Sequence, residues 1–112
     1  MKIIFATYSN KKNNHLNRYQ SSCFHNDIQP IILGKDDKFF SFKNKIDTMI
    51  NFLNDLNQND IVVFTDCWDV IILEDEKKIL NKFLSFNVPI LFSSEKNKLC
   101  LNEEASRKWI EK

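Results

Sequence analysis

Glycine is almost absent from this sequence: Gly34 is the only one in 112 residues. The Walker loop and the dinucleotide-binding loop both need several glycines, which let backbone amides approach a phosphate closely. The composition therefore excludes both loops. A phosphate bound by this chain would have to be held by a metal ion, by lysine or by ordinary backbone amides.

Cysteine is scarce as well, and long apolar runs are missing. Cys23, Cys67 and Cys100 are odd in number and widely spaced, and no Cys-x-x-Cys pair occurs. This pattern argues against a disulfide framework and a structural zinc site. The apolar stretch in residues 2–7 is too short for a signal peptide, and no run reaches the length of a membrane span. We therefore expect a cytoplasmic protein without a membrane span.

An excess of charge of either sign is also lacking, because 16 basic and 15 acidic residues leave a net charge of +1. Such a balance gives no strong attraction to nucleic acid, and we expect no nucleic-acid partner. The chain is 43% hydrophobic and 28% charged, as is usual for a globular protein. Its length suits a single domain over residues 1–112 with a real core.

Strand-like and helix-like patterns alternate along the chain. We expect strands over residues 2–7, 28–33, 60–65 and 88–93, with a short extended piece at 70–73. We expect helices that begin near residue 14, near residue 42 and within residues 74–76, the second running to about residue 57, and a last helix over 103–111. This alternation predicts an α/β fold: a Rossmann-like, mostly parallel sheet with flanking helices. Right-handed crossovers would bring Thr7, Asp66 and residues 93–95 to one edge of the sheet.

The expected helices carry both caps and apolar stripes. Asn13 or Asn14 can cap the first helix, Ser41 the second, and the acidic residues 74–76 suit the start of the third. Apolar side chains recur at helical spacing in all three helices. The first stripe is Leu16, Tyr19, Cys23 and Phe24; the second is Phe42, Ile46, Met49, Ile50, Leu53 and Leu56; the third is Ile79, Leu80, Phe83 and Leu84.

Two carboxylates follow the third expected strand, in the sequence Phe64-Thr65-Asp66-Cys67-Trp68-Asp69-Val70. Ligands bind at the carboxyl ends of strands in open α/β sheets. Two hard oxygen ligands there suit Mg²⁺ or Mn²⁺, and such an ion suits a diphosphate. On the residues alone a second interpretation stays open, in which one aspartate caps the loop and the other is solvated. In this interpretation Trp68 simply packs over the edge of the sheet.

The stretch 64–70 resembles the glycosyltransferase domain of the procollagen lysyl hydroxylase/glycosyltransferase and procollagen galactosyltransferase group, a GT-A-type domain. That family has a strand ending in an FTD-x-[YW]-DV-like motif. The resemblance extends to four further pieces in the same order. Three of these are the opening strand that ends in Ala6-Thr7, the Leu-Gly-x-Asp at residues 33–36, and the strand ending in Ser-x-Glu at residues 90–95. The fourth is Lys45, early in the second expected helix, which matches a family lysine placed just before the long helix.

The resemblance implies a UDP-hexose donor, with glucose or galactose as the sugar, held together with Mn²⁺ or Mg²⁺. It assigns Asp66 and Asp69 to the metal and Trp68 to stacking on the uracil. It also implies that two residues of the first strand line the nucleoside pocket, and that a lysine lies near the donor: Phe5 and Thr7, and Lys45.

Chemistry supports part of this assignment. A lysine in the first turn of a helix is poorly matched to the helix dipole, and an anionic phosphate nearby would explain the position of Lys45. Without the resemblance, Lys45 would be interpreted as a solvated surface residue. An indole beside two carboxylates offers a flat face to a base.

The resemblance covers the donor-binding half of the family domain. That domain continues with acceptor-side residues and a further metal-ligating histidine, which neither His15 nor His25 matches. We expect these two histidines, which flank the first helix, to be surface groups. Three explanations stay open: the chain is a fragment with a missing C-terminal half, its gene has decayed, or a partner chain completes the site. The hydroxyl acceptor is unknown, with collagen-like hydroxylysine as the family's suggestion, and no residue is assigned as catalytic.

Two other functions remain open from the sequence. A strand ending in Asp-x-x-Asp is similar to the Asp-x-Asp of haloacid-dehalogenase-type phosphatases, whose first aspartate is a nucleophile. Those enzymes carry the motif on the first strand and with one residue less between the carboxylates. Alternatively, the chain is a non-catalytic module that binds a UDP-sugar or a protein partner.

Overall fold

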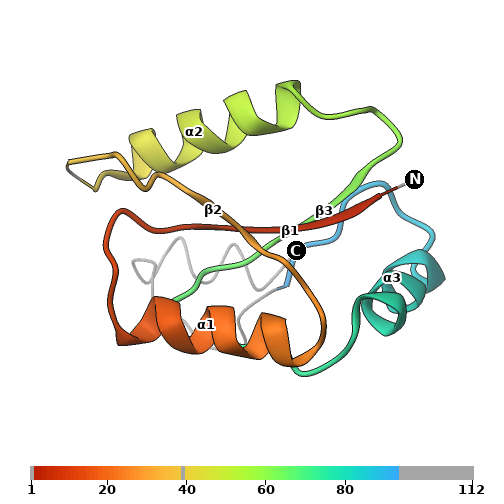
Figure 1. Cartoon of the computed structure of the whole chain (residues 1–112). Coiled ribbons are helices and arrows are strands. Elements are labelled where there is room, and N and C mark those ends of the chain that lie inside the picture. Colours follow the sequence, from red (N-terminus) through yellow and green to blue (C-terminus); the bar gives the residue numbers. More distant parts are fainter. Residues whose placement is uncertain (1, 39, 94–112) are drawn as a thin grey trace, which may run out of the picture.

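The computed structural model describes residues 2–38 and 40–93. Strands and helices alternate along this part of the chain (Figure 1). The order is β1 (Ile3–Tyr8), α1 (Asn14–His25), β2 (Ile31–Leu33), α2 (Phe42–Asn54), β3 (Ile61–Phe64) and α3 (Glu76–Ser85). Among the described residues, no helix is long and apolar enough to cross a membrane.

The strands form one parallel sheet in the order β2-β1-β3, so β1 lies in the middle. Ala6 is in register with Ile31 of β2 and with Phe64 of β3. Figure 1 shows α1 and α2 on opposite sides of these strands. The prediction of a Rossmann-like α/β fold is therefore confirmed, and the carboxyl ends of all three strands point the same way.

The core lies between the sheet and α1. Asn13 caps α1 as expected, because its side chain accepts a hydrogen bond from the Leu16 backbone N–H over 3.0 Å. Phe24 was expected on the buried stripe but is exposed, since it lies about 100° further round the helix than Cys23. The buried cluster is Phe5, Leu16, Tyr19, Cys23, Ile28, Ile32, Cys67 and Ile72.

The second helix forms but leaves most of its apolar stripe uncovered. Ser41 caps it by accepting from the Asn44 N–H, and it ends at Asn54 rather than near residue 57. It ends early because the backbone tightens: the Leu56 N–H reaches back three residues to the Leu53 carbonyl. The exposed members of the stripe are Phe42, Ile46, Ile50 and Leu53.

Two strand predictions need correction. The second strand begins at Ile31 and not at Ile28, because the Ile28 N–H closes the end of α1 by bonding to the Cys23 carbonyl and Pro30 has no N–H to donate. Residues 88–93 form no strand and their apolar side chains are exposed. An apolar run becomes a strand only beside a partner strand, and no described strand pairs with this one.

Hydrogen bonds fix the start of α3 and the connection that leads to it from β3. Asp75 caps α3, accepting from the Lys78 N–H over 2.8 Å. Residues 70–73 form no strand, but Ile72 is tied to α1: its N–H donates to Ser22 Oγ and its carbonyl accepts from Asn26 Nδ2. The helix predicted over 103–111, and the approach of residues 94 and 95 to the sheet edge, lie outside the described residues.

Candidate functional site

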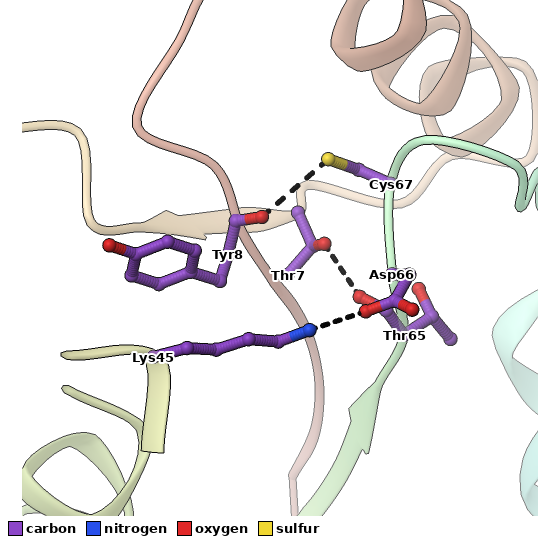
Figure 2. A network of polar contacts seen from close by, with 6 residues as sticks. All are labelled: Thr7, Tyr8, Lys45, Thr65, Asp66 and Cys67. Atoms are coloured by element: carbon purple, nitrogen blue, oxygen red, sulfur yellow. Dashed lines mark hydrogen bonds and ion pairs between the residues drawn. The ribbon is translucent and has the colours of Figure 1, made fainter. Parts of the chain in front are cut away.

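The ends of β1 and β3 are joined side by side at the carboxyl edge of the sheet. Thr7 Oγ1 donates to the Thr65 carbonyl over 2.6 Å, and the Thr65 N–H donates to the Ala6 carbonyl over 3.2 Å. The buried Cys67 thiol approaches the Tyr8 carbonyl at 3.6 Å (Figure 2). These contacts hold the backbone on both sides of Asp66, so the expected approach of Thr7 and Asp66 is confirmed.

Lys45 and Asp66 come together across this edge from different elements. Lys45 Nζ lies 2.6 Å from Asp66 Oδ1, as Figure 2 shows. The ammonium also lies 5.9 Å from the centre of the Phe64 ring, within the range of a cation–π contact. The helix dipole disfavours a cation such as Lys45 in the first turn of α2, and the neighbouring Asp66 carboxylate offsets this effect.

Trp68 turns toward α1 and stacks on His15. The ring centroids are 4.8 Å apart and the planes differ by 16°. Arg18, one helical turn after His15, places Nη2 2.5 Å from His15 Nδ1. His15 was expected to be a surface group, and no local sequence signal points to this contact. It arises because the short connection from β1 brings the first turn of α1 to the strand ends.

Two carboxylates lie in the loop that follows β3. Asp66 and Asp69 are both exposed, and Asp69 lies in the same bend as Trp68. Within the described part of the chain, no three His, Cys, Asp or Glu side chains gather as a metal cluster. Mg²⁺ is commonly held by one or two carboxylates together with phosphate oxygens and water, and Mn²⁺ accepts the same ligands. The residues therefore fit such an ion when a diphosphate supplies the other ligands.

Phe5 and Thr7 lie below the surface of the edge. The Phe5 ring is buried in the core, and Thr7 is fully buried with its hydroxyl committed to the Thr65 carbonyl. The structure therefore places both residues where they support the strand ends. Neither side chain lines an open surface.

Tyr8 forms a contact that no pattern in the sequence predicts. Its hydroxyl donates to Asp37 Oδ2 over 2.5 Å. Burial, together with the hydrogen bond and the negative charge of Asp37, raises the pKa of Tyr8 to about 12. Gly34 makes room for the ring: a Cβ at this position, where φ is +79°, would lie 2.2 Å from Tyr8 Cε2. The Leu-Gly-x-Asp stretch at residues 33–36 contains that glycine, but the acceptor of the hydrogen bond is the next aspartate, Asp37.

An open cavity of about 770 Å³ lies beside His15 on the α1 side. Its lining contains amides, hydroxyls and one guanidinium, and no acidic side chain among the described residues. The lining residues are Asn14, His15, Asn17, Arg18, Ser21, Ser22 and Ile71. This cavity suits a neutral or anionic ligand better than a cation, and Asp66 and Lys45 are not part of it.

Comparison with known proteins identifies the family of the chain. The chain matches no curated protein and no solved structure. The family model of the PLOD GT domain, by contrast, matches residues 1–107. That match includes all three strands, both aspartates, Lys45 and Trp68. Because it spans nearly the whole sequence, the chain belongs to the family of PLOD glycosyltransferase domains.

Proposed function

We propose that this glycosyltransferase domain binds a UDP-hexose, UDP-glucose or UDP-galactose, through a divalent cation held by Asp66 and Asp69. The observation that carries the proposal is the convergence of a carboxylate, an ammonium and an exposed indole at the carboxyl edge of the sheet. Asp66 and Trp68 lie in the loop after β3, whereas Lys45 comes from α2. This edge is where α/β folds bind their ligands. The proposed ion is Mn²⁺ or Mg²⁺.

Each group has a role in holding the donor. Asp66 and Asp69 are the protein ligands of the cation, which would act as a Lewis acid toward the diphosphate. Lys45 would bring a positive charge to the oxygen atoms of the diphosphate, and until the cation binds, its contact with Asp66 keeps the ammonium at the edge. Trp68 offers its flat face to the uracil. Phe5 and Thr7 support the strand ends beneath this proposed donor site.

The transfer itself goes to a hydroxyl acceptor, for which collagen-like hydroxylysine is the family's suggestion. A haloacid-dehalogenase-type phosphatase fits the structure less well. In those enzymes the nucleophilic aspartate ends the first strand, whereas β1 ends here in Thr7 and Tyr8. Asp66 instead lies in the loop after β3, an edge strand of the three-stranded sheet, and is paired with Lys45.

The melting temperature measured with UDP, with and without Mn²⁺, tests the proposal. UDP at about a hundred times its dissociation constant should stabilise the fold by roughly 2.7 kcal/mol. For a domain of this size the shift is on the order of 10 °C. We expect the shift to require Mn²⁺ and to vanish in Asp69→Ala.

Asp47→Ala is the matched control, because Asp47 is an exposed carboxylate on α2 whose partner is Lys43. It should respond to UDP as the wild type does. An absent shift, or one that persists unchanged in Asp69→Ala, would contradict the proposed donor site. Release of phosphate from simple phosphate esters would favour the phosphatase instead, and UDP-sugar binding without transfer to any hydroxyl would favour the non-catalytic module.

A further inference from the structure

The Trp68 indole is exposed, yet it has a defined position. Its side chain is 54% exposed. The residue sits in the bend at 67–69, outside any helix or strand. An exposed side chain on such a loop loses rotamer freedom when a ligand stacks on it, and this loss weakens binding. A ring that is already held in place avoids much of that loss.

His15, which belongs to the helix α1, keeps the Trp68 ring in position. The residue lies in the first turn of α1, which is fixed by the Asn13 cap. The nearly parallel rings, 4.8 Å apart and tilted by 16°, have the geometry of a stacked aromatic pair. The imidazole covers one face of the indole, so a ligand base would have to stack on the other.

Arg18 in turn holds the imidazole in its orientation. Its Nη2 donates to His15 Nδ1 over 2.5 Å. A guanidinium has only N–H donors, so Nδ1 must be the acceptor and carries no hydrogen. Residues three apart lie on the same face of a helix, and Arg18 therefore orients the ring without any distortion of α1.

We propose that His15 is a positioning residue of the donor site: it holds the Trp68 indole ready for the base of a nucleoside diphosphate, and Arg18 keeps the imidazole in place. This inference rests on the proposed function, because it assigns the free face of Trp68 to the donor base. His15 acts through Trp68 and needs no contact with the donor.

Calorimetric titration with UDP and Mn²⁺ tests this role in the full chain. Loss of one aromatic stack should weaken UDP binding by about 2- to 12-fold in His15→Ala. His15→Phe should restore the affinity, because a phenyl ring can stack on the indole without help from Arg18. Arg18→Gln should weaken binding in the wild type and have no effect in His15→Phe. His25→Ala, at the exposed end of the same helix, is the matched control and should bind normally.

Fluorescence of Trp68 gives a second readout that needs no ligand. In a Trp109→Phe background Trp68 is the only indole in the chain. We expect His15→Ala to lower its steady-state anisotropy and raise its quenching by acrylamide, and His15→Phe to reverse both changes. A merely destabilising substitution would lower the melting temperature without being rescued in this way.

The outcomes separate the two proposals. If wild type and Trp68→Ala bind UDP equally well, or if neither binds, the proposed donor site fails and this role fails with it. If Trp68→Ala loses affinity while His15→Ala keeps it, only the role of His15 is overturned. A Phe variant that does not recover the affinity of the wild type would also overturn it.

Discussion

Lys45 and a divalent cation would compete for the same carboxylate. Lys45 Nζ contacts Asp66 Oδ1, and the Asp66 side chain is 60% exposed. Ion pairs at such exposed positions contribute about 0–1 kcal/mol, so a cation can displace the ammonium at little cost. The displaced ammonium would remain beside the metal, where a diphosphate would lie in the proposed complex.

Replacement of Lys45 by methionine should separate these two effects. We expect Lys45→Met to bind Mn²⁺ alone at least as tightly as the wild type, because the competing cation is gone. Binding of UDP in the presence of Mn²⁺ should weaken on the order of tenfold, from the loss of a charge-assisted hydrogen bond. Calorimetry measures both constants. Lys43→Met, which removes an exposed lysine paired with Asp47, is the control. Unchanged UDP affinity in Lys45→Met would contradict the assigned role.

Tyr8 makes stability depend on alkaline pH. Its pKa is raised from 10.0 to about 12 in the fold, so between these values the unfolded chain has lost a proton that the folded chain retains. The free energy of unfolding should therefore be fully supported below pH 10 and fall as the pH rises toward about 12. Denaturant titrations across this range measure the effect.

Two variants test whether Tyr8 and Asp37 cause this pH dependence. Tyr8→Phe should reduce the alkaline slope, although part of it will remain because burial also raises the pKa of Tyr19. Asp37→Asn should reduce the slope less, since burial is the largest cause of the shift at Tyr8 and Asp37 adds to it. An identical slope in Tyr8→Phe and wild type would show that Tyr8 is not responsible.

At the scale of the elements, the sequence predicts what local chemistry decides. Asn13, Ser41 and the acidic start of α3 mark the helix beginnings because each cap satisfies a backbone N–H within a few residues. Whether a residue is buried, by contrast, depends on contacts with residues far away in the sequence. Residues 88–93 have the composition of a buried strand, but only a partner strand could make them one, and hydropathy does not say whether a partner is present.

Substitutions in the apolar stripes of α2 and α1 test which of the two stripes is buried, through their effect on the free energy of unfolding. Ile46 and Ile50 are 56% and 49% exposed, so replacing each by serine should change the free energy of unfolding by less than about 1 kcal/mol. Leu16→Ala, on the buried stripe of α1, should cost about 2–5 kcal/mol. Urea unfolding compares the variants. A cost at Ile50 as large as that at Leu16 would mean that the α2 stripe is covered in solution.

At the scale of the whole molecule, the sequence predicts the edge but not all of its contacts. Parallel strands and right-handed crossovers are enough to bring the end of β1 close to Asp66. The Trp68–His15 stack and the Tyr8–Asp37 hydrogen bond depend instead on loop conformations, which no periodicity encodes. The proposed donor site is therefore partly readable from the sequence, whereas the residues that hold its side chains in place are not.

The hydrogen bond from Thr7 to the Thr65 carbonyl joins residues 58 apart and links the central strand to the aspartate loop. Thr7→Val keeps the shape of the side chain but removes the donor. It should lower the free energy of unfolding by about 1 kcal/mol. It should also weaken Mn²⁺-dependent UDP binding, because the backbone next to Asp66 loses its anchor on β1. Thr7→Ser, which retains the hydroxyl, should bind UDP better than Thr7→Val in the same calorimetric titration. Equal affinities in the two variants would show that this strand-to-strand hydrogen bond stabilises the fold without shaping the donor site.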